Sequence, residues 1–398
     1  MMTTAAIITP VFPPYRGGMG VLAELDARQL AAAGYDVHVY APIKPVVASG
    51  RWGLSPARDR PIDRAAITSG GSITMHPLKP IFRYGNAAIV PSLRNIVKQY
   101  PLVILHYPFY GGAEFAALAG RAKLTKLLIT YHMDTVGRGL PGAIFRAHAF
   151  AVMPFLLRAA DRLLVTSLDY AESSLLAKIS GLKPRIRELA PAVDTLSFSP
   201  GPRPDDLAGR FGIGRGDKVV LMVGGLDRAH YFKGVPVLLN ALATRDLAGI
   251  KAVIVGDGDL RPSYELMAAK LGLAGRVSFA GAADPAALAG FYRLADVFAF
   301  PSIARSEEFG LEALEALATG LPVVASSLPG VRTIVREGLT GRLVAPGSAS
   351  SLAARLAEVL GDDAARKRMG TAARSMVERE YAEAVRLGRW RDILAELK

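Results

Sequence analysis

Two glutamates, Glu307 and Glu315, stand eight residues apart around the start of a segment with helical periodicity. From Leu311 onward, leucines recur every three residues with alanines between them, and Gly320 is a typical helix stop. Eight residues span a little over two helical turns, so side chains at this spacing lie roughly one above the other on one face. The helix start also offers unpaired N–H groups that attract anions. A helix end that attracts phosphate, beside two acceptors for hydroxyl groups, suits a sugar nucleotide.

A pair of cations follows an apolar, strand-like segment at residues 218–223. The loop after this segment carries Arg228 and Lys233, and Gly234 leads into another helical pattern. Cations between a strand end and a helix start are well placed to hold a diphosphate, because Arg binds oxygens bidentately and Lys acts as a point charge. We therefore predict a diphosphate site here, with a solvated surface side chain as the alternative for Arg228.

The N-terminal segment combines a predicted strand at residues 5–9 with a loop that contains Gly17 and Gly18. Glycine-rich turns between a strand and a helix let the backbone approach a phosphate closely. A nicotinamide-binding domain would need G-x-G-x-x-G and an acidic residue after the second strand. The glycines here are spaced differently, and Tyr40, Ala41 and Pro42 supply no acid. The dehydrogenase interpretation is therefore disfavoured.

Two histidines lie at the ends of predicted buried strands. His106 ends an apolar run that begins at residue 102, and His132 follows a run at residues 127–130. Ligands of open parallel sheets bind at strand ends, where a His can hydrogen-bond a sugar hydroxyl. His132 is the stronger candidate, and His106 is a second one on the side of the acceptor.

The length and composition of the chain limit the classes of protein to which it can belong. A chain of 398 residues suits two domains, and its apolar content is typical of parallel strands covered by helices. We expect no transmembrane helix and no signal peptide, and the absence of cysteine excludes disulfides and thiolate metal sites. Most of the net charge of +13 lies in the first half of the chain, without a nucleic-acid motif.

Residues 78–100 mix basic and large apolar side chains, and from Pro91 their spacing is helical. A basic amphipathic element of this kind can rest on a membrane surface. A helix that faces the core and exposes its basic residues is the favoured alternative.

The frame around the two glutamates resembles the E-x7-E signature of the family-4 (GT4) retaining glycosyltransferases, which have the GT-B fold. The agreement extends beyond the glutamates to Ser302, Phe309-Gly310 and Pro322-Val323-Val324, and to flanking segments on both sides: Ala295-Asp296-Val297, Pro301-Ser302, Pro329-Gly330 and Glu337-Gly338-Leu339-Thr340-Gly341. The resemblance implies two facing Rossmann-like domains, each a doubly wound parallel sheet.

The resemblance also implies roles for the candidate residues. Arg228 and Lys233 would neutralise the diphosphate, and Glu315 would accept hydrogen bonds from the ribose. Glu307 would orient the sugar hydroxyls near His132. The remaining donor contacts would come from backbone groups and neighbours of the two motifs: Gly17, Gly18, Glu308, Phe309, Gly310 and Leu311. The chain departs from the family at Gly225, where an Arg is usual, and at Thr333, where a Glu is frequent.

The resulting hypothesis is a cytoplasmic, metal-independent glycosyltransferase that needs no cofactor. It would move a sugar from a UDP- or GDP-linked donor to a glycan or a lipid-linked acceptor of the cell envelope, with contact to a membrane surface left open. We expect an acceptor-side domain over residues 1–200, a nucleotide-sugar domain over 201–375, and a helix over 376–398 that returns to the first domain. A sugar-nucleotide epimerase or hydrolase of the same fold, and a non-catalytic binding protein, stay as alternatives.

Overall fold

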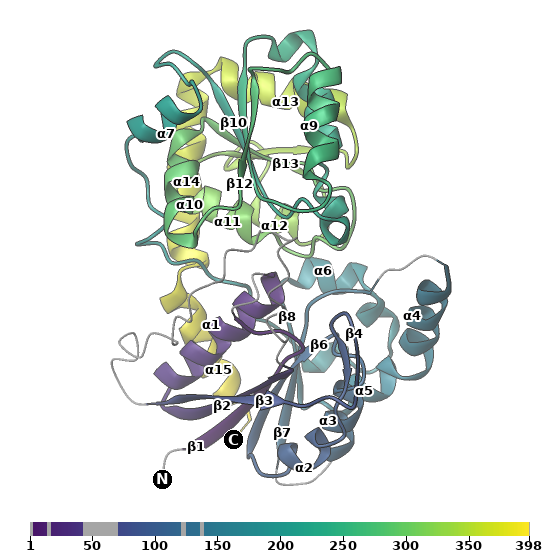
Figure 1. The fold of residues 1–398 in the computed structure, drawn as a ribbon. Coiled ribbons are helices and arrows are strands. Elements are labelled where there is room, and N and C mark those ends of the chain that lie inside the picture. The colour runs from purple at the N-terminus through teal and green to yellow at the C-terminus, as the bar shows by residue number, and fades with distance from the viewer. Residues whose placement is uncertain (1–2, 14–16, 43–70, 121–124, 136–138, 398) are drawn as a thin grey trace. The chain divides into compact units, whose positions relative to one another are not determined.

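The computed structural model describes residues 3–13, 17–42, 71–120, 125–135 and 139–397. The chain divides into an N-terminal unit, Met1–Pro191 together with Arg386–Lys398, and a C-terminal unit, Ala192–Val385. The divisions expected from the sequence lie after residues 200 and 375. Each unit has its own sheet (Figure 1). Each also has its own hydrophobic core.

The N-terminal unit contains a parallel sheet of seven strands among the described residues, in the order β3-β2-β1-β6-β7-β8-β9. Its central strand β6 is buried along its whole length and β7 is buried after its first residue, as expected for a sheet covered on both faces. A separate antiparallel hairpin pairs β4 with β5. The strands of this unit are β1 (Thr3–Ile8), β2 (Tyr35–Pro42), β3 (Ile73–Leu78), β4 (Phe82–Tyr84), β5 (Ala87–Ile89), β6 (Leu102–Tyr107), β7 (Lys126–Tyr131), β8 (Arg162–Val165) and β9 (Ile186–Glu188).

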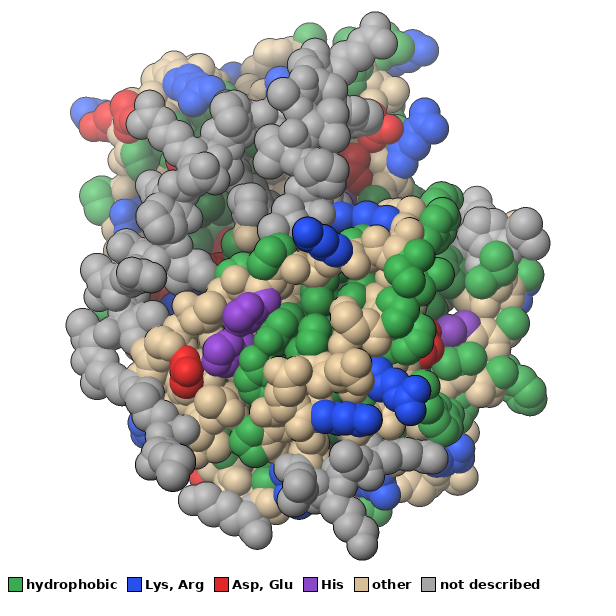
Figure 2. All heavy atoms as spheres, turned by 60° about the horizontal axis from the view of Figure 1, so that its bottom comes forward, with side chains coloured by type: hydrophobic (Ala, Val, Ile, Leu, Met, Phe, Trp, Pro, Cys, Tyr) green, Lys and Arg blue, Asp and Glu red, His purple; other side chains and the backbone are tan. Residues whose placement is uncertain are grey.

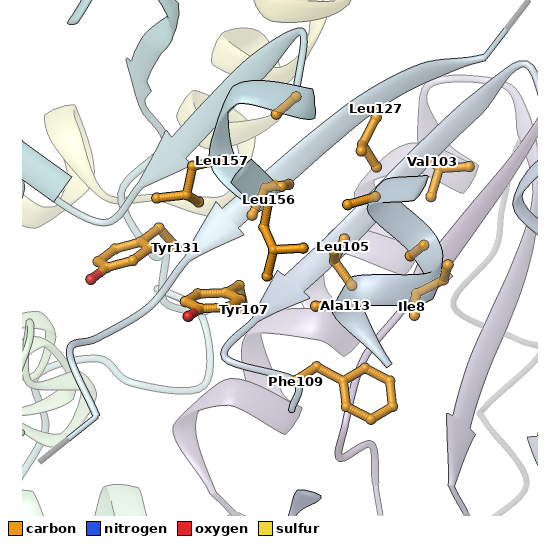
Figure 3. Close-up of a cluster of buried hydrophobic side chains, with 14 of the residues drawn as sticks. Ile8, Val103, Leu105, Tyr107, Phe109, Ala113, Leu127, Tyr131, Leu156 and Leu157 are labelled. Atoms are coloured by element: carbon orange, nitrogen blue, oxygen red, sulfur yellow. The ribbon is translucent and has the colours of Figure 1, made fainter. Parts of the chain in front are cut away.

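Helices cover both faces of this sheet. On one face, side chains of the sheet pack against Ala113 of α3 and against Leu156 and Leu157 of α5 (Figure 3). On the other face, α1 and α15 bury Leu30 and Trp390. The helices of this unit are α1 (Gly18–Ala32), α2 (Leu93–Val97), α3 (Ala113–Gly120), α4 (Gly139–Ala151), α5 (Met153–Ala159), α6 (Leu168–Ser173), the short 3₁₀ segments η2 (Leu175–Lys178) and η3 (Lys183–Arg185), and α15 (Glu383–Ala395), which joins this unit from Arg386 onward.

The C-terminal unit contains a parallel sheet of six strands in the order β12-β11-β10-β13-β14-β15, all within the described range. Its strands are β10 (Val219–Val223), β11 (Lys251–Val255), β12 (Val277–Gly281), β13 (Val297–Phe300), β14 (Val323–Ser326) and β15 (Gly341–Val344). Its helices are α7 (Asp205–Arg210), η4 (Arg228–Lys233), α8 (Val235–Leu242), η5 (Arg245–Leu247), α9 (Arg261–Lys270), α10 (Pro285–Leu294), α11 (Leu311–Ala318), α12 (Val331–Ile334), α13 (Ala349–Gly361) and α14 (Asp363–Glu380).

Both sheets reverse their strand order at one point. In the N-terminal unit the reversal falls between β1 and β6, and in the C-terminal unit it falls between β10 and β13. The carboxyl ends of the strands at such a switch point form the usual ligand crevice of an open α/β sheet. The two α/β domains with doubly wound parallel sheets expected from the sequence are confirmed. No helix in the described ranges is long and apolar enough to cross a bilayer.

Candidate functional site

The predicted diphosphate residues lie at the switch point of the C-terminal unit. Strand β10 is followed by the loop and η4 that end at Lys233, and β13 is followed by the segment from Ser302 to Gly310. Because β10 and β13 are neighbours in the sheet, the two segments emerge side by side. Gly234 has a φ of 78°, and a Cβ at this residue would lie 2.0 Å from the carbonyl oxygen of Pro301. Glycine therefore lets the two segments approach closely.

Lys233 connects the two segments through ion pairs. Its Nζ lies 2.9 Å from Oε2 of Glu307 and 2.9 Å from Oε1 of Glu312. Glu307 also accepts a hydrogen bond of 2.9 Å from the hydroxyl of Ser302, which is fully buried. The same Nζ lies 5.1 Å from the centre of the Phe300 ring. The centre of the Phe232 ring lies 5.9 Å from it, so two carboxylates and two aromatic rings surround the ammonium group, and only 5 % of the lysine is exposed.

Burial and charge oppose each other within this cluster. Burial alone favours the neutral amine of Lys233, but Glu307 and Glu312 outweigh burial and raise the pKa of Lys233 above its usual range. Burial raises the pKa of Glu307, and Glu312 adds to this increase while Lys233 opposes it. One ammonium therefore forms ion pairs with two carboxylates. An incoming phosphate must compete with these carboxylates for Lys233.

Glu315 lies one turn after Glu312 on α11 and makes a separate contact. Its Oε2 accepts a hydrogen bond of 2.6 Å from the hydroxyl of Tyr292 on α10. Burial raises the pKa of Glu315 to about 8, the Tyr292 hydrogen bond opposes the increase, and Glu312 adds to it. Near neutral pH this carboxyl is therefore largely protonated, and a ligand that donates hydrogen bonds to it favours its ionised form.

The start of α11 has the geometry of an anion site. Gly310 precedes the first helical residue, Leu311, and has a φ of 95° without a side-chain cap. A Cβ at Gly310 would lie 2.8 Å from the Phe300 ring, so only glycine fits here. Phe309 is buried against Tyr381, whereas Glu308 is half-buried. The first backbone N–H groups of a helix point out of its N-terminal end, where an anion can accept hydrogen bonds from them.

The structure does not bring Arg228 to the Lys233 cluster. Its guanidinium is 85 % exposed and forms an ion pair of 3.1 Å with Asp259. The space beside Gly225 is occupied by His230, whose Nδ1 would lie 2.7 Å from a Cβ at that position. His230 in turn bonds to Asp227 at 2.9 Å. A side chain at residue 225 would therefore collide with His230, and Arg228 reaches solvent instead.

In the N-terminal unit, His106 and His132 lie at neighbouring strand ends. His106 is on β6 and His132 follows β7, and their rings join by a hydrogen bond of 2.9 Å between Nδ1 of His106 and Nε2 of His132. The exposed fraction is 2 % for His132 and 0 % for His106. The side chain of His106 has no exposed surface in this structure, and its role on the acceptor side stays a prediction.

Gly17 and Gly18 lie at the start of α1, which follows β1 next to β6 in the sheet. The carbonyl oxygen of Gly17 accepts hydrogen bonds from the N–H groups of Gly20 and Val21 at 2.9 and 3.1 Å. The glycines are therefore at the switch point of this sheet, on the same edge as His132. Residues 14–16 of the predicted loop lie outside the described part of the chain.

Glu312 and Tyr292 were not predicted from the sequence as residues of the site. Glu312 had an available signal, because residues 312 and 315 are three apart on one helix and share a face. Tyr292 had none, because its contact joins two helices that are distant in sequence. Among the described residues, no group of three or more His, Asp and Glu side chains is arranged to hold a metal ion.

Comparison with protein families identifies both units. The family model of glycosyl transferases group 1 matches residues 205–376, within the C-terminal unit. The model of the glycosyl transferase 4-like domain matches residues 17–184, within the N-terminal unit. Together the two models cover most of the chain.

Characterised relatives extend the similarity over the whole length. The chain is 28% identical to a GDP-mannose-dependent alpha-(1-6)-phosphatidylinositol monomannoside mannosyltransferase of Mycobacterium tuberculosis, in an alignment that covers 100% of this chain and 97% of that protein. It is 39% identical to a D-inositol 3-phosphate glycosyltransferase of Corynebacterium glutamicum (strain R), over 47% of this chain and 46% of that protein.

Solved structures share the fold. A sucrose-phosphate synthase from Thermosynechococcus elongatus superimposes with a TM-score of 0.76 at 22% identity, with 99% of both chains covered. Anabaena Alr3699/HepE, solved in complex with UDP, gives a TM-score of 0.77 at 18% identity, covering 99% of this chain and 100% of that one. At these identities the likeness establishes the two-domain GT-B architecture.

Proposed function

The chain belongs to the group 1 glycosyl transferases of family GT4 and is a glycosyltransferase, and from this membership we propose its donor, its acceptor class and its site residues. The donor is a nucleoside-diphosphate sugar that binds at the switch point of the C-terminal unit. The acceptor is a lipid-linked or inositol-containing molecule of glycolipid synthesis. Transfer retains the configuration of the sugar and uses no metal ion.

The observation that carries the donor assignment is the cluster of Lys233, Glu307 and Glu312 beside the start of α11. A diphosphate would replace the two carboxylates as the ion-pair partner of the Lys233 ammonium. The N–H groups at Gly310 and Leu311 would share its remaining charge. Together they would stabilise the departing nucleoside diphosphate, a role that a metal ion fills in other enzymes.

The two glutamates of the signature would each bind one of the remaining parts of the donor. Glu315 lies beyond the helix start and would accept hydrogen bonds from the ribose hydroxyls. Glu307 precedes the helix, is held by Ser302, and would orient the hydroxyls of the sugar ring. Arg228 would approach the diphosphate only by leaving Asp259, which its high exposure permits. The domain closure usual in transferases would exclude water from the reaction.

His132, Gly17 and Gly18 would contribute the acceptor side of the reaction centre. They lie on one edge of the N-terminal sheet, at the carboxyl ends of β1 and β7. His132 would hydrogen-bond a reacting hydroxyl, and the two glycines would let the backbone approach the donor phosphate.

A lipid acceptor is supported by the names of the relatives and by the surface of the N-terminal unit. The relative from Mycobacterium tuberculosis is named for GDP-mannose and for a phosphatidylinositol substrate. Around the hairpin of β4 and β5, Ile81, Phe82 and Tyr84 are exposed by 60 to 77 %. Figure 2 shows hydrophobic side chains gathered on one face, with Lys and Arg side chains beside them. Such a surface suits contact with anionic lipid.

Helix α2 has a different role from the hairpin. Leu93 and Val97 of α2 are fully buried in the core, while Arg94 and Lys98 are exposed. The helical part of residues 78–100 therefore packs on the core, as the favoured alternative expected. Within residues 78–100, the large apolar side chains that are exposed belong to the hairpin and to Ile81 just before it.

Calorimetric titration with UDP, GDP and ADP tests the donor assignment, with wild type and Glu315→Ala compared. Micromolar binding of one diphosphate, lost in the variant, supports the site and identifies the nucleotide. The matching radiolabelled sugar nucleotide is then incubated with inositol phosphate and with phosphatidylinositol vesicles to find the acceptor. Absence of binding by all three nucleotides in the folded protein would overturn the assignment of Lys233 and Glu315.

A further inference from the structure

A line of buried polar side chains connects the C-terminal helix α15 to His132 within the N-terminal unit. Arg386 donates a hydrogen bond of 2.6 Å to Oδ1 of Asp26, and Trp390 Nε1 donates one of 3.0 Å to the same atom. Oδ2 of Asp26 lies 3.4 Å from Nε2 of His106, and neither of these two buried atoms has a hydrogen-bond partner among the described residues. Nδ1 of His106 then meets Nε2 of His132 at 2.9 Å. All five side chains are at most 2 % exposed.

The position of the protons in this line follows from charge. Burial holds the pKa of His106 well below its usual range, and His132 and Arg386 add to this effect. His106 is therefore neutral and carries one ring proton, on either Nδ1 or Nε2. A proton on Nδ1 would leave the lone pair of Nε2 facing a carboxylate oxygen in a dry interior. The charge of Asp26 therefore favours the proton on Nε2.

This assignment determines the role of the neighbouring ring. With its proton on Nε2, His106 has an unprotonated Nδ1, which can only accept a hydrogen bond. Nε2 of His132 must then be the donor in the contact of 2.9 Å between the two rings. In neutral His132 the other nitrogen, Nδ1, is consequently the acceptor.

We propose that Asp26 and His106 are positioning residues that hold His132 as the tautomer protonated on Nε2, so that Nδ1 of His132 accepts a hydrogen bond from a reacting hydroxyl. Arg386 and Trp390 of α15 hold Asp26 in the orientation that this requires. The catalytic meaning of this arrangement rests on the proposed role of His132. The tautomer itself is a property of the protein without substrate.

Asp26→Asn tests the line with almost no change in shape. The side-chain oxygen of Asn must face the two donors Arg386 and Trp390, so its NH₂ group faces Nε2 of His106. His106 then carries its proton on Nδ1, and His132 must accept on Nε2, which reverses both tautomers. Selective ¹⁵N labelling of the six histidines, with two-bond ¹H–¹⁵N correlation spectra of the full chain, reads these tautomers directly.

The wild-type spectrum should show His106 and His132 protonated on Nε2, and the Asp26→Asn spectrum should show both protonated on Nδ1. Transfer activity should fall by about 100-fold or more in kcat, with the KM for the donor unchanged. A wild-type His132 protonated on Nδ1, or identical tautomers in the two proteins, would overturn the proposal. If the tautomers of both proteins are as expected but the Asp26→Asn variant keeps its activity, the hydrogen-bond arrangement is supported. The assigned role of His132 is then contradicted.

Two further variants separate positioning from folding. Glu396→Gln weakens the surface contacts of this end of the chain with Arg162 and Arg187 but does not touch Asp26, so tautomers and activity should match wild type. If Asp26→Asn does not fold, His106→Phe keeps most of the buried volume and removes the acceptor of His132 Nε2. His132 should then populate both tautomers, and a single Nε2-protonated form would contradict the proposal.

Discussion

Tyr292 on α10 donates a hydrogen bond of 2.6 Å to Oε2 of Glu315 on α11. Tyr292 is buried and Glu315 is half-buried, and burial raises the pKa of Glu315 to about 8 and raises the pKa of Tyr292 well above its usual range. The contact keeps the carboxyl in place while the donor site is empty. It also makes Glu315 a group whose charge changes within the physiological pH range.

The first prediction concerns the pH dependence of nucleotide binding. If ribose hydroxyls donate to Glu315, the bound state favours the ionised carboxyl, and binding releases a proton below pH 8. Affinity should therefore increase with pH by up to about tenfold per unit and level off above pH 8. Calorimetry from pH 7 to pH 9 measures this slope. Glu315→Gln should bind more weakly and lack the slope, and an equal slope in both proteins would contradict the role of Glu315.

The second prediction concerns competition for Lys233. Glu312→Gln removes one of the two charges that hold the ammonium, so the affinity for the nucleoside diphosphate should increase by about 3- to 10-fold. Lys233→Met should lower it by about 30-fold or more, because a charge-assisted contact is lost. Glu265→Gln on α9, which pairs with Arg261, serves as the control and should bind as wild type does. Weaker binding by Glu312→Gln would mean that Glu312 contacts the ligand directly.

The third prediction concerns the backbone at the start of α11. Gly310→Ala places a Cβ 2.8 Å from the Phe300 ring at a φ of 95°, which should destabilise the C-terminal unit by about 1 to 3 kcal/mol. Gly361→Ala in α13 is the matched control, because its Cβ would enter open space. It should be neutral or stabilise by about 1 kcal/mol. Denaturant unfolding measures both, and equal stability of the two variants would show that Gly310 is not required at this turn.

The fourth prediction concerns the exposed hairpin. Phe82→Ser with Tyr84→Ser should lower binding to vesicles that contain phosphatidylglycerol by at least about tenfold, because two large apolar side chains are removed. Binding by wild type should weaken with added salt and be small on pure phosphatidylcholine. Leu266→Ser changes a similarly exposed residue of the C-terminal unit and should leave binding intact. If the double variant binds vesicles as tightly as wild type does, the hairpin does not contact the membrane.

Local spacing in the sequence was enough to predict the parallel α/β architecture and the helix that starts at Leu311. Apolar runs such as residues 219–223 have to be buried on both faces, and the glycine before a helix start is required by its backbone conformation. The E-x7-E frame predicted the family, which the comparisons confirm. The roles assigned to its individual residues stay predictions.

Contacts between elements were decided by the tertiary structure alone. The sequence offers no sign that Lys233 binds Glu312, that Arg228 instead pairs with Asp259, or that Asp26 meets Arg386 at the far end of the chain. Periodicity determines which face of one element is buried, because it depends only on the geometry of that element. Which side chains then meet depends on how the elements pack. For that reason His106, a surface candidate by its position at a strand end, became a buried partner of His132.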